Sequence, residues 1–257
     1  MKTRISSNIG FVANPWPLQD DRPTLVLIHG SGQDSGFWVH QMDAFEKAAN
    51  VVALDLPGRG ASQEPGLDSM IAYAHEVMKF IDRIAAPDPI PAGLSIGGGI
   101  VLQLLLDHPE KFEGGILVNT GARLRVKQEI FDLIKTNFQE YVDAFCTFGL
   151  SPQSNAKALK PQIASFTTAS AVATFGDYSA CNNFDVMDRL SEIQTPVLVL
   201  SAEDDFLTPP KYGQFLADNI SNAQLANIDA AGHMAPFEKP EAVNQAIEGY
   251  LKSLRSG

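Results

Sequence analysis

The sequence is short of cysteine, and this shortage excludes two kinds of protein. Cys146 and Cys181 are its only cysteines, they lie far apart, and neither Cys-x-x-Cys nor His-Glu-x-x-His occurs. A zinc site and a disulfide framework are therefore not expected, and no metal is predicted. We expect two buried, reduced thiols.

Positive charge is also scarce. The 257 residues include 19 Lys and Arg against 30 Asp and Glu, a formal net charge of −11 at pH 7. Nucleic-acid binding uses clustered Lys and Arg to release counterions from phosphates, and no such cluster occurs. We predict no nucleic-acid partner and interpret the acidity as favouring solubility.

Long apolar runs are missing as well. No stretch reaches the about 20 apolar residues that a membrane span needs, and residues 1–20 lack the apolar core of a signal peptide. A cytoplasmic protein without a membrane partner is expected. The length fits one compact domain, as a monomer or a homodimer.

What the chain does have is a repeated alternation of short apolar runs and longer amphipathic segments. Strands buried on both faces are nearly continuous in apolar residues, so this pattern is typical of a parallel sheet between helices. Helices are predicted over Ser69–Ala85 and over Pro240–Leu254. The predicted strands are Thr24–His29, Asn50–Asp55, Gly114–Asn119, Pro196–Ser201 and Ala223–Ile228. We therefore predict an α/β fold with a mostly parallel twisted sheet covered by helices on both faces.

Residues 121–190 interrupt this alternation, because they lack convincing strands and indicate short amphipathic helices and loops. We interpret them as a small helical cap inserted into a core of residues 1–120 and 191–257, within a single structural domain. Its apolar side chains pack the cap on the core or line a pocket: Phe131, Leu133, Ile134, Phe138, Tyr141, Phe145 and Phe148.

Residues 93–97 (GLSIG) match the Gly-x-Ser-x-Gly nucleophile elbow, a tight strand-to-helix turn that exposes the serine hydroxyl. A bulkier residue at either glycine would collide with the neighbouring strand and helix. Residues 98–106 predict a buried helix, whose N-terminus would point free amides at Ser95. Pro89 and Pro91 lie in the strand predicted before the turn. Since proline cannot donate a ladder hydrogen bond, this strand is expected to be short.

The His29-Gly30-Ser31-Gly32 loop follows the first strong strand, where an oxyanion loop is expected. The backbone amides of Ser31 and Ile96 are predicted to form the oxyanion hole, at roughly 3 kcal/mol per donor. In an alternative, Ser31 is the nucleophile and His29 its base. It is disfavoured because this loop lacks an elbow, and His29 is interpreted as structural.

A serine nucleophile needs a base, and the base needs a carboxylate to fix its tautomer. Among the five histidines, His40 and His75 fall on predicted helices, and His108 ends one. With His29 in the oxyanion loop, His233 is left as the base, on a glycine-flanked loop after the last predicted strand.

The acid is expected after another strand, where Glu203, Asp204 and Asp205 compete. Side chains that are neighbours in such a turn face different ways, so only one bonds the imidazole. Physical argument from the sequence does not choose between Asp204 and Asp205. The chain order of serine, aspartate and His233 is the one that this fold requires.

Five blocks in order resemble the α/β-hydrolase family, across essentially the whole chain outside the cap. They are HGSG at 29–32, DLPGRGAS at 55–62, GLSIGG at 93–98, AEDDFLTP at 202–209 and GHMAPFEKPEAV at 232–243. The family's acid ends a G-x-x-D block, which implies Asp205, with Ala202 in place of the glycine. The resemblance also implies residues that hold loops near the site: Asp55, Gly58, Arg59, Gly60, Glu238 and Pro240.

The resemblance implies a serine hydrolase of the carboxylesterase or enol-lactonase type. Such an enzyme would cleave a carboxylic ester of a small, largely apolar substrate through an acyl-enzyme on Ser95, without a cofactor. Serine at the elbow argues against a dehalogenase-like enzyme, whose nucleophile is a carboxylate.

Other functions stay open at this stage. Lactone cleavage is one, because GLSIGG and NTGARL at 119–124 resemble enol-lactonases. Carbon–carbon bond hydrolases and cofactor-free haloperoxidases share the triad. A menaquinone-pathway lyase is disfavoured, because Gly99 and Ile100 stand where that subfamily has an arginine. A receptor-like binding protein with slow turnover is the competing class.

The expected substrate pocket is the least determined part of the site. Phe37 and Trp38 wall it or pack in the core, and Arg123 and Arg125 bind a substrate carboxylate or are ordinary surface residues. The predicted pocket residues are Gly30, Gly32, Trp38, Leu94, Phe206 and Met234.

Overall fold

A computed structural model describes residues 2–255. Over these residues the strands form one eight-stranded sheet in the order β1-β2-β4-β3-β5-β6-β7-β8. The strands from β3 to β8 are parallel, whereas the β1–β2 hairpin joins β4 antiparallel. Their bounds are β1 Thr3–Ser6, β2 Ile9–Asn14, β3 Thr24–Ile28, β4 Asn50–Leu54, β5 Pro89–Leu94, β6 Gly115–Val118, β7 Val197–Ala202 and β8 Ala223–Ile228. The predicted mostly parallel sheet is confirmed, and only the hairpin was not foreseen.

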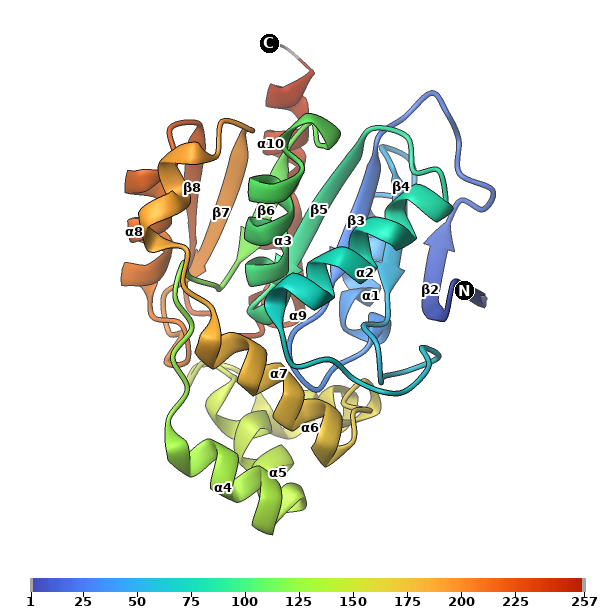
Figure 1. Cartoon of the computed structure of the whole chain (residues 1–257). Helices are drawn as coiled ribbons and strands as arrows, with labels where there is room; N and C mark the ends of the chain where they lie inside the picture. The colour runs from blue at the N-terminus through green and yellow to red at the C-terminus, as the bar shows by residue number, and fades with distance from the viewer. Residues whose placement is uncertain (1, 256–257) are drawn as a thin grey trace.

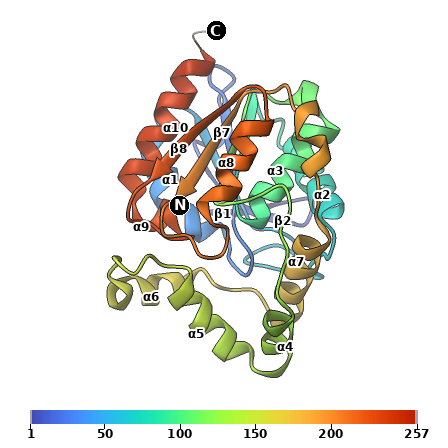
Figure 2. The same ribbon diagram turned by 90° about the vertical axis from the view of Figure 1, so that its left-hand side faces the viewer.

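Helices cover both faces of this sheet, with α2, α3 and α8 on one side and α1, α9 and α10 on the other (Figure 1 and Figure 2). Alternate side chains of each central strand enter the two cores: Val26 and Ile28 one, Leu25 and Leu27 the other. The helix bounds are α1 Val39–Ala44, α2 Met70–Arg83, α3 Ile96–Asp107, α8 Pro210–Asn219, α9 Ala235–Glu238 and α10 Pro240–Leu254. Short 3₁₀ helices are η1 Ser35–Trp38, η2 Pro109–Lys111 and η3 Met187–Glu192.

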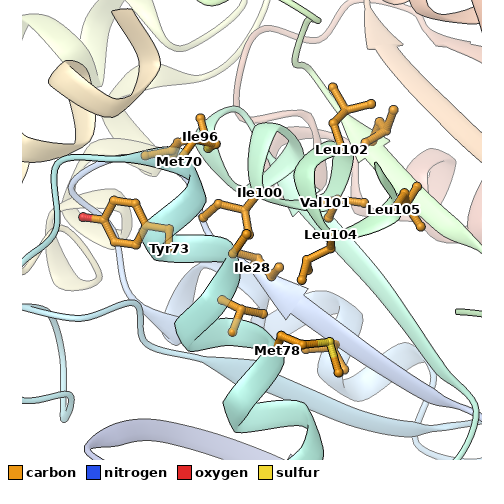
Figure 3. Packing of buried hydrophobic residues seen from close by; sticks show 14 of the residues in the cluster. Ile28, Met70, Tyr73, Met78, Ile96, Ile100, Val101, Leu102, Leu104 and Leu105 are labelled. Carbon is orange, nitrogen blue, oxygen red and sulfur yellow. The ribbon is translucent and has the colours of Figure 1, made fainter. Parts of the chain in front are cut away.

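The packing of α2 against α3 fixes the helix that begins directly after Ser95. Side chains of the two helices meet over β3, as Ile28, Met70, Ile96 and Ile100 show in Figure 3. Burying one such aliphatic side chain contributes about 2 kcal/mol. The start of α3 is therefore held by the core.

The prolines of β5 are accommodated by the alternation of its hydrogen bonds. Thr24 N donates to Asp88 O on the β3 side, and Ser95 N donates to Val118 O on the β6 side. The backbone N and O atoms of odd-numbered residues in β5, including both prolines, therefore point towards β6. Pairing with β6 covers only residues 92–94, whereas pairing with β3 covers residues 89–93. The missing N–H groups thus fall where β6 does not pair. The expectation of a short strand is therefore wrong, because β5 has six residues.

Between β6 and β7 the chain forms the inserted helices α4 Gln128–Thr136, α5 Phe138–Phe148, α6 Ala156–Ser165 and α7 Ala171–Asn183. Both views show them gathered beyond one end of the strands, below the sheet (Figure 1 and Figure 2). Cys146 and Cys181 are buried there and free. Within residues 2–255, no helix has the length and apolar character needed to cross a membrane.

Candidate active site

Ser95 occupies a strained turn between the end of β5 and the start of α3. Its backbone has φ 55° and ψ −115°, a conformation that costs a non-glycine residue of order 1–3 kcal/mol. Ser95 N donates to Val118 O at 3.0 Å, and Thr120 Oγ1 donates to Ser95 O at 2.7 Å. These hydrogen bonds and the packing of the buried helix α3 keep Ser95 in this strained conformation.

The two glycines of the turn are required by close backbone approach. A Cβ at Gly93 would lie 2.1 Å from the carbonyl carbon of Gly97. A Cβ at Gly97 would lie 2.4 Å from Ile28 O, on the neighbouring strand. The steric reason predicted for the Gly-x-Ser-x-Gly spacing is what the backbone shows.

His233 and Asp205 form a buried pair at the ends of two different strands. His233 Nδ1 lies 2.8 Å from Asp205 Oδ2, and both residues are 3% exposed. The other carboxylate oxygen accepts from the N–H groups of Leu207 and Thr208 at 2.8 and 2.9 Å. An ionised Asp205 makes Nδ1 the protonated ring nitrogen, so Nε2 is left as the proton acceptor.

Electrostatics keep this carboxyl ionised. Burial by itself would raise the pKa of Asp205, but His233 and the hydrogen bonds from Thr208 outweigh it and hold that pKa below its usual value. The imidazole orientation and tautomer are thereby fixed near neutral pH.

The neighbouring acids face other partners. Asp204 Oδ2 accepts from Ser151 Oγ at 2.6 Å and from Gln153 Nε2 at 3.2 Å. Glu203 Oε2 accepts from Ala230 N at 3.0 Å. Of the three candidates left open by the sequence, only Asp205 contacts the imidazole.

Asn119 is a supporting residue that sequence reasoning missed. Its Nδ2 donates to the carbonyl oxygens of Gly232 and His233 at 3.1 and 3.0 Å, and its Oδ1 accepts from Ala202 N at 2.9 Å. It ties the histidine loop to the end of β7. A polar residue at the end of a predicted strand was the available signal.

A cavity of about 300 Å³ contains both Ser95 and His233 in its wall. Within the described residues the Ser95 hydroxyl makes no hydrogen bond, so it is free to meet a substrate. The wall is formed by Gly30, Ser31, Gln33, Leu94, Ser95, Leu124, Arg125, Val126, Lys127, Ile130, Phe145, Tyr178, Cys181, Phe206, Leu207, Thr208, Tyr212 and His233.

The predicted pocket needs correction at three positions. Gly30, Leu94 and Phe206 line this cavity, whereas Gly32, Trp38 and Met234 do not. Trp38 and Met234 are 0% exposed and belong to the hydrophobic core, because their segments pack against the sheet. Gly32 N instead donates to Asp177 Oδ2 at 3.1 Å.

The loop of residues 29–32 borders this cavity. Ser31 lines the cavity, and Ile96 is the first residue of α3, where a helix N–H lacks an intrahelical acceptor. Among the hydrogen bonds of residues 2–255, none uses the N–H of Ser31 or Ile96. Both donors are therefore free for a ligand oxygen.

His29 is a structural residue of this loop. Its Nε2 accepts from Leu56 N at 3.0 Å, and its Nδ1 lies 2.8 Å from Gly30 O. Burial, aided by Arg59, lowers the pKa of His29 to about 4. With both ring nitrogens engaged and the ring neutral, His29 has no free nitrogen to serve as a base.

A buried network joins the loop of residues 29–32 to helix α7. Asp177 Oδ2 accepts from Ser31 Oγ at 2.9 Å and from Gly32 N at 3.1 Å. Its Oδ1 accepts from Tyr73 OH at 2.8 Å and pairs with Arg59, and both members of the ion pair are fully buried. Burial alone would lower the pKa of Arg59, but Asp177 raises it above its usual value. Sequence reasoning missed Asp177, although it is the only charged residue of α7.

Over residues 2–255 no group of three or more His, Cys, Asp and Glu side chains is placed to hold a metal ion.

The chain is similar to known proteins in sequence and in structure. The model of the family described as "Alpha/beta hydrolase family" matches residues 25–246. The chain is 27% identical to the 3-oxoadipate enol-lactonase 2 of Acinetobacter baylyi, over 91% of this chain and 90% of that protein. It is 31% identical to a putative carbamate hydrolase RutD of Serratia proteamaculans, over 89% and 91%. The enol-lactonase structure from Burkholderia xenovorans LB400 superposes with a TM-score of 0.87 at 21% identity, covering 98% of this chain and 100% of that one.

Proposed function

Since the chain belongs to the alpha/beta hydrolase family, we propose that it is a serine hydrolase that cleaves a carboxylic ester. One observation carries the proposal. Ser95, on its strained turn, shares a cavity with His233, whose Nδ1 is bound by a buried, ionised Asp205. This is the arrangement of nucleophile, base and orienting acid that acyl transfer needs.

In the proposed mechanism His233 Nε2 takes the proton of Ser95 Oγ as the oxygen attacks the substrate carbonyl carbon. The N–H groups of Ser31 and Ile96 donate to the resulting oxyanion, at roughly 3 kcal/mol per donor. Collapse breaks the ester bond, and His233 returns the proton to the leaving alcohol. His233 then deprotonates a water that attacks the acyl carbonyl carbon, and the acid is released as His233 returns this proton to Ser95 Oγ.

We assign residues 121–190 the role of a cap on a core of residues 1–120 and 191–257. The inserted helices contribute Ile130, Phe145 and Tyr178 to the cavity wall, which also includes Leu94, Leu124, Phe206 and Leu207. An apolar cavity of about 300 Å³ suits a small, largely apolar substrate.

A cyclic ester is the second candidate, because the same groups would open a lactone and keep the leaving alcohol tethered. The relatives named as enol-lactonase and carbamate hydrolase favour including lactones and carbamates among the substrates to test. A receptor-like protein would bind such compounds with negligible turnover.

The test is intact-mass analysis after a fluorophosphonate, with hydrolysis of p-nitrophenyl acetate and butyrate, ethyl carbamate and a lactone panel. Wild type and the control Ser221→Ala, which changes an exposed serine before β8, should gain one adduct and turn over. Ser95→Ala should gain none and lose at least about 10⁴-fold in kcat. Labelling and turnover of Ser95→Ala would refute the assigned nucleophile, and ligand binding by an unlabelled wild type would favour a receptor.

A further inference from the structure

A second cavity of about 310 Å³ adjoins the catalytic cavity, and the two share Arg125 and Tyr212 in their walls. We call it the side cavity. Because two wall residues are shared, the side cavity lies directly beside the cavity that contains Ser95. Its wall is formed by Ala122, Arg123, Arg125, Met187, Lys211, Tyr212 and Phe215.

The charged groups at these two cavities all have one sign. Arg123, Arg125 and Lys211 line the side cavity, and Lys127 lines the catalytic cavity. Within the described residues no Asp or Glu lines either one. In a chain with 30 acidic and 19 basic residues, composition alone would favour the opposite bias.

The arginines are oriented but not neutralised. Arg123 Nε lies 2.6 Å from Asp185 Oδ2, and Arg125 Nη2 lies 3.7 Å from the same oxygen. One carboxylate between two guanidinium groups leaves a positive charge in excess. Lys211 adds another, with its Nζ 5.9 Å from the ring centre of Tyr212, on the shared wall.

We propose that the side cavity binds an anionic oxygen group of the substrate, a carboxylate or phosphate, at the end of an apolar arm. Guanidinium N–H pairs match the oxygens of either anion. Met187, Tyr212 and Phe215 supply apolar contacts for the arm. The position of the scissile ester rests on the proposed function, whereas the anion site itself does not.

The kinetic test compares mono-p-nitrophenyl adipate, which has a free carboxylate, with its neutral methyl ester. The measured quantity is the ratio of their kcat/KM values. Arg123→Gln and Lys211→Gln should each lower this ratio by about fivefold, the value of an exposed ion pair of about 1 kcal/mol. Lys47→Gln, an equal loss of charge in the exposed loop before β4, should leave it unchanged. An unchanged ratio in both cavity variants would overturn the inference.

A binding test separates this inference from the proposed function. Calorimetry on Ser95→Ala measures monomethyl adipate against dimethyl adipate, with and without Lys211→Gln. Weaker binding of only the anion in the Lys211→Gln protein supports the site even if no ester is hydrolysed. If both esters are hydrolysed and the cavity variants have no effect, the proposed hydrolase function is retained and the anion site is refuted. Hexanoate and monohexyl phosphate, compared as ligands, distinguish carboxylate from phosphate.

Discussion

At the scale of single residues, the choice between two adjacent aspartates is the feature that matters most. Asp205 contacts His233 Nδ1, whereas the carboxylate of Asp204 is taken by Ser151 and Gln153. The two side chains differ by one position and by their entire surroundings. Substitution by asparagine is therefore expected to affect kcat strongly at Asp205 and little at Asp204.

Asp205→Asn should lower kcat by about 10⁴-fold, because an amide favours the wrong imidazole tautomer. Asp204→Asn is the matched control and should keep kcat within about tenfold, because it does not touch the imidazole. Steady-state kinetics of both variants, with circular dichroism as a check of folding, decide the matter. Equal losses in the two variants would show that the acid is misassigned.

The pKa of Asp205 also predicts a pH effect on stability. Its folded value is depressed, so the stabilisation is complete above the unfolded value of about 3.9 and is lost as pH falls through the folded value. Urea denaturation from pH 6 to pH 2 should show an acid-dependent loss that is smaller in Asp205→Asn. Parallel curves for the two proteins would contradict the depressed pKa.

At the scale of elements, helix α7 and the loop of residues 29–32 are held together by buried hydrogen bonds. Asp177 binds the Ser31–Gly32 segment with one oxygen and Arg59 and Tyr73 with the other. The close packing continues at Gly176, where a Cβ would lie 2.3 Å from Leu67 O. The inserted helices are thus fastened to the loop that presents the Ser31 amide.

Asp177→Asn should lower the free energy of unfolding by about 3–5 kcal/mol, because it leaves the buried Arg59 charge unpaired. Asp185→Asn breaks the exposed pair with Arg123 and should cost about 1 kcal/mol or less. Equilibrium urea unfolding measures both. Similar costs for the two substitutions would mean that the buried network contributes no more than a surface pair.

At the scale of the whole molecule, a net charge of −11 opposes the positive groups around the two cavities. Salt screens charges that lie farther from a bound substrate than the Debye length, which is about 8 Å at physiological ionic strength. The charges nearest the substrate therefore act on it most strongly. The four cations Arg123, Arg125, Lys127 and Lys211 line the cavities themselves, whereas among the described residues no Asp or Glu does.

Raising the ionic strength from about 0.02 to 0.5 M should therefore lower kcat/KM for an anionic ester relative to its neutral analogue. Stopped-assay rates of mono-p-nitrophenyl adipate and its methyl ester across this range provide the measurement. A rise of the anionic rate with salt would show that the overall negative charge dominates.

Much of the fold followed from local patterns. Five of the parallel strands were predicted to within about one residue at each end, and for β3, β4, β6 and β7 the reason is that a strand buried on both faces must be apolar throughout. β8 was also located, although most of its residues are partly exposed. β5 was expected to be short and instead has six residues. The β1–β2 hairpin was missed because its first strand is partly exposed and short. The turn at Ser95 could be predicted because a side chain at either of its glycines would collide with neighbouring backbone atoms.

The class of sheet, the turn at Ser95 and the histidine loop could be predicted from the sequence, because periodicity and backbone sterics act over a few residues. The contact of Asp205 with His233, which physical argument from the sequence left open and the family resemblance implied, is visible in the packing of the two strand ends. The same packing places Trp38 and Met234 in the core and Asp177 against Ser31. Each of these depends on which distant segments pack together, and Asp177 lies 146 residues from Ser31.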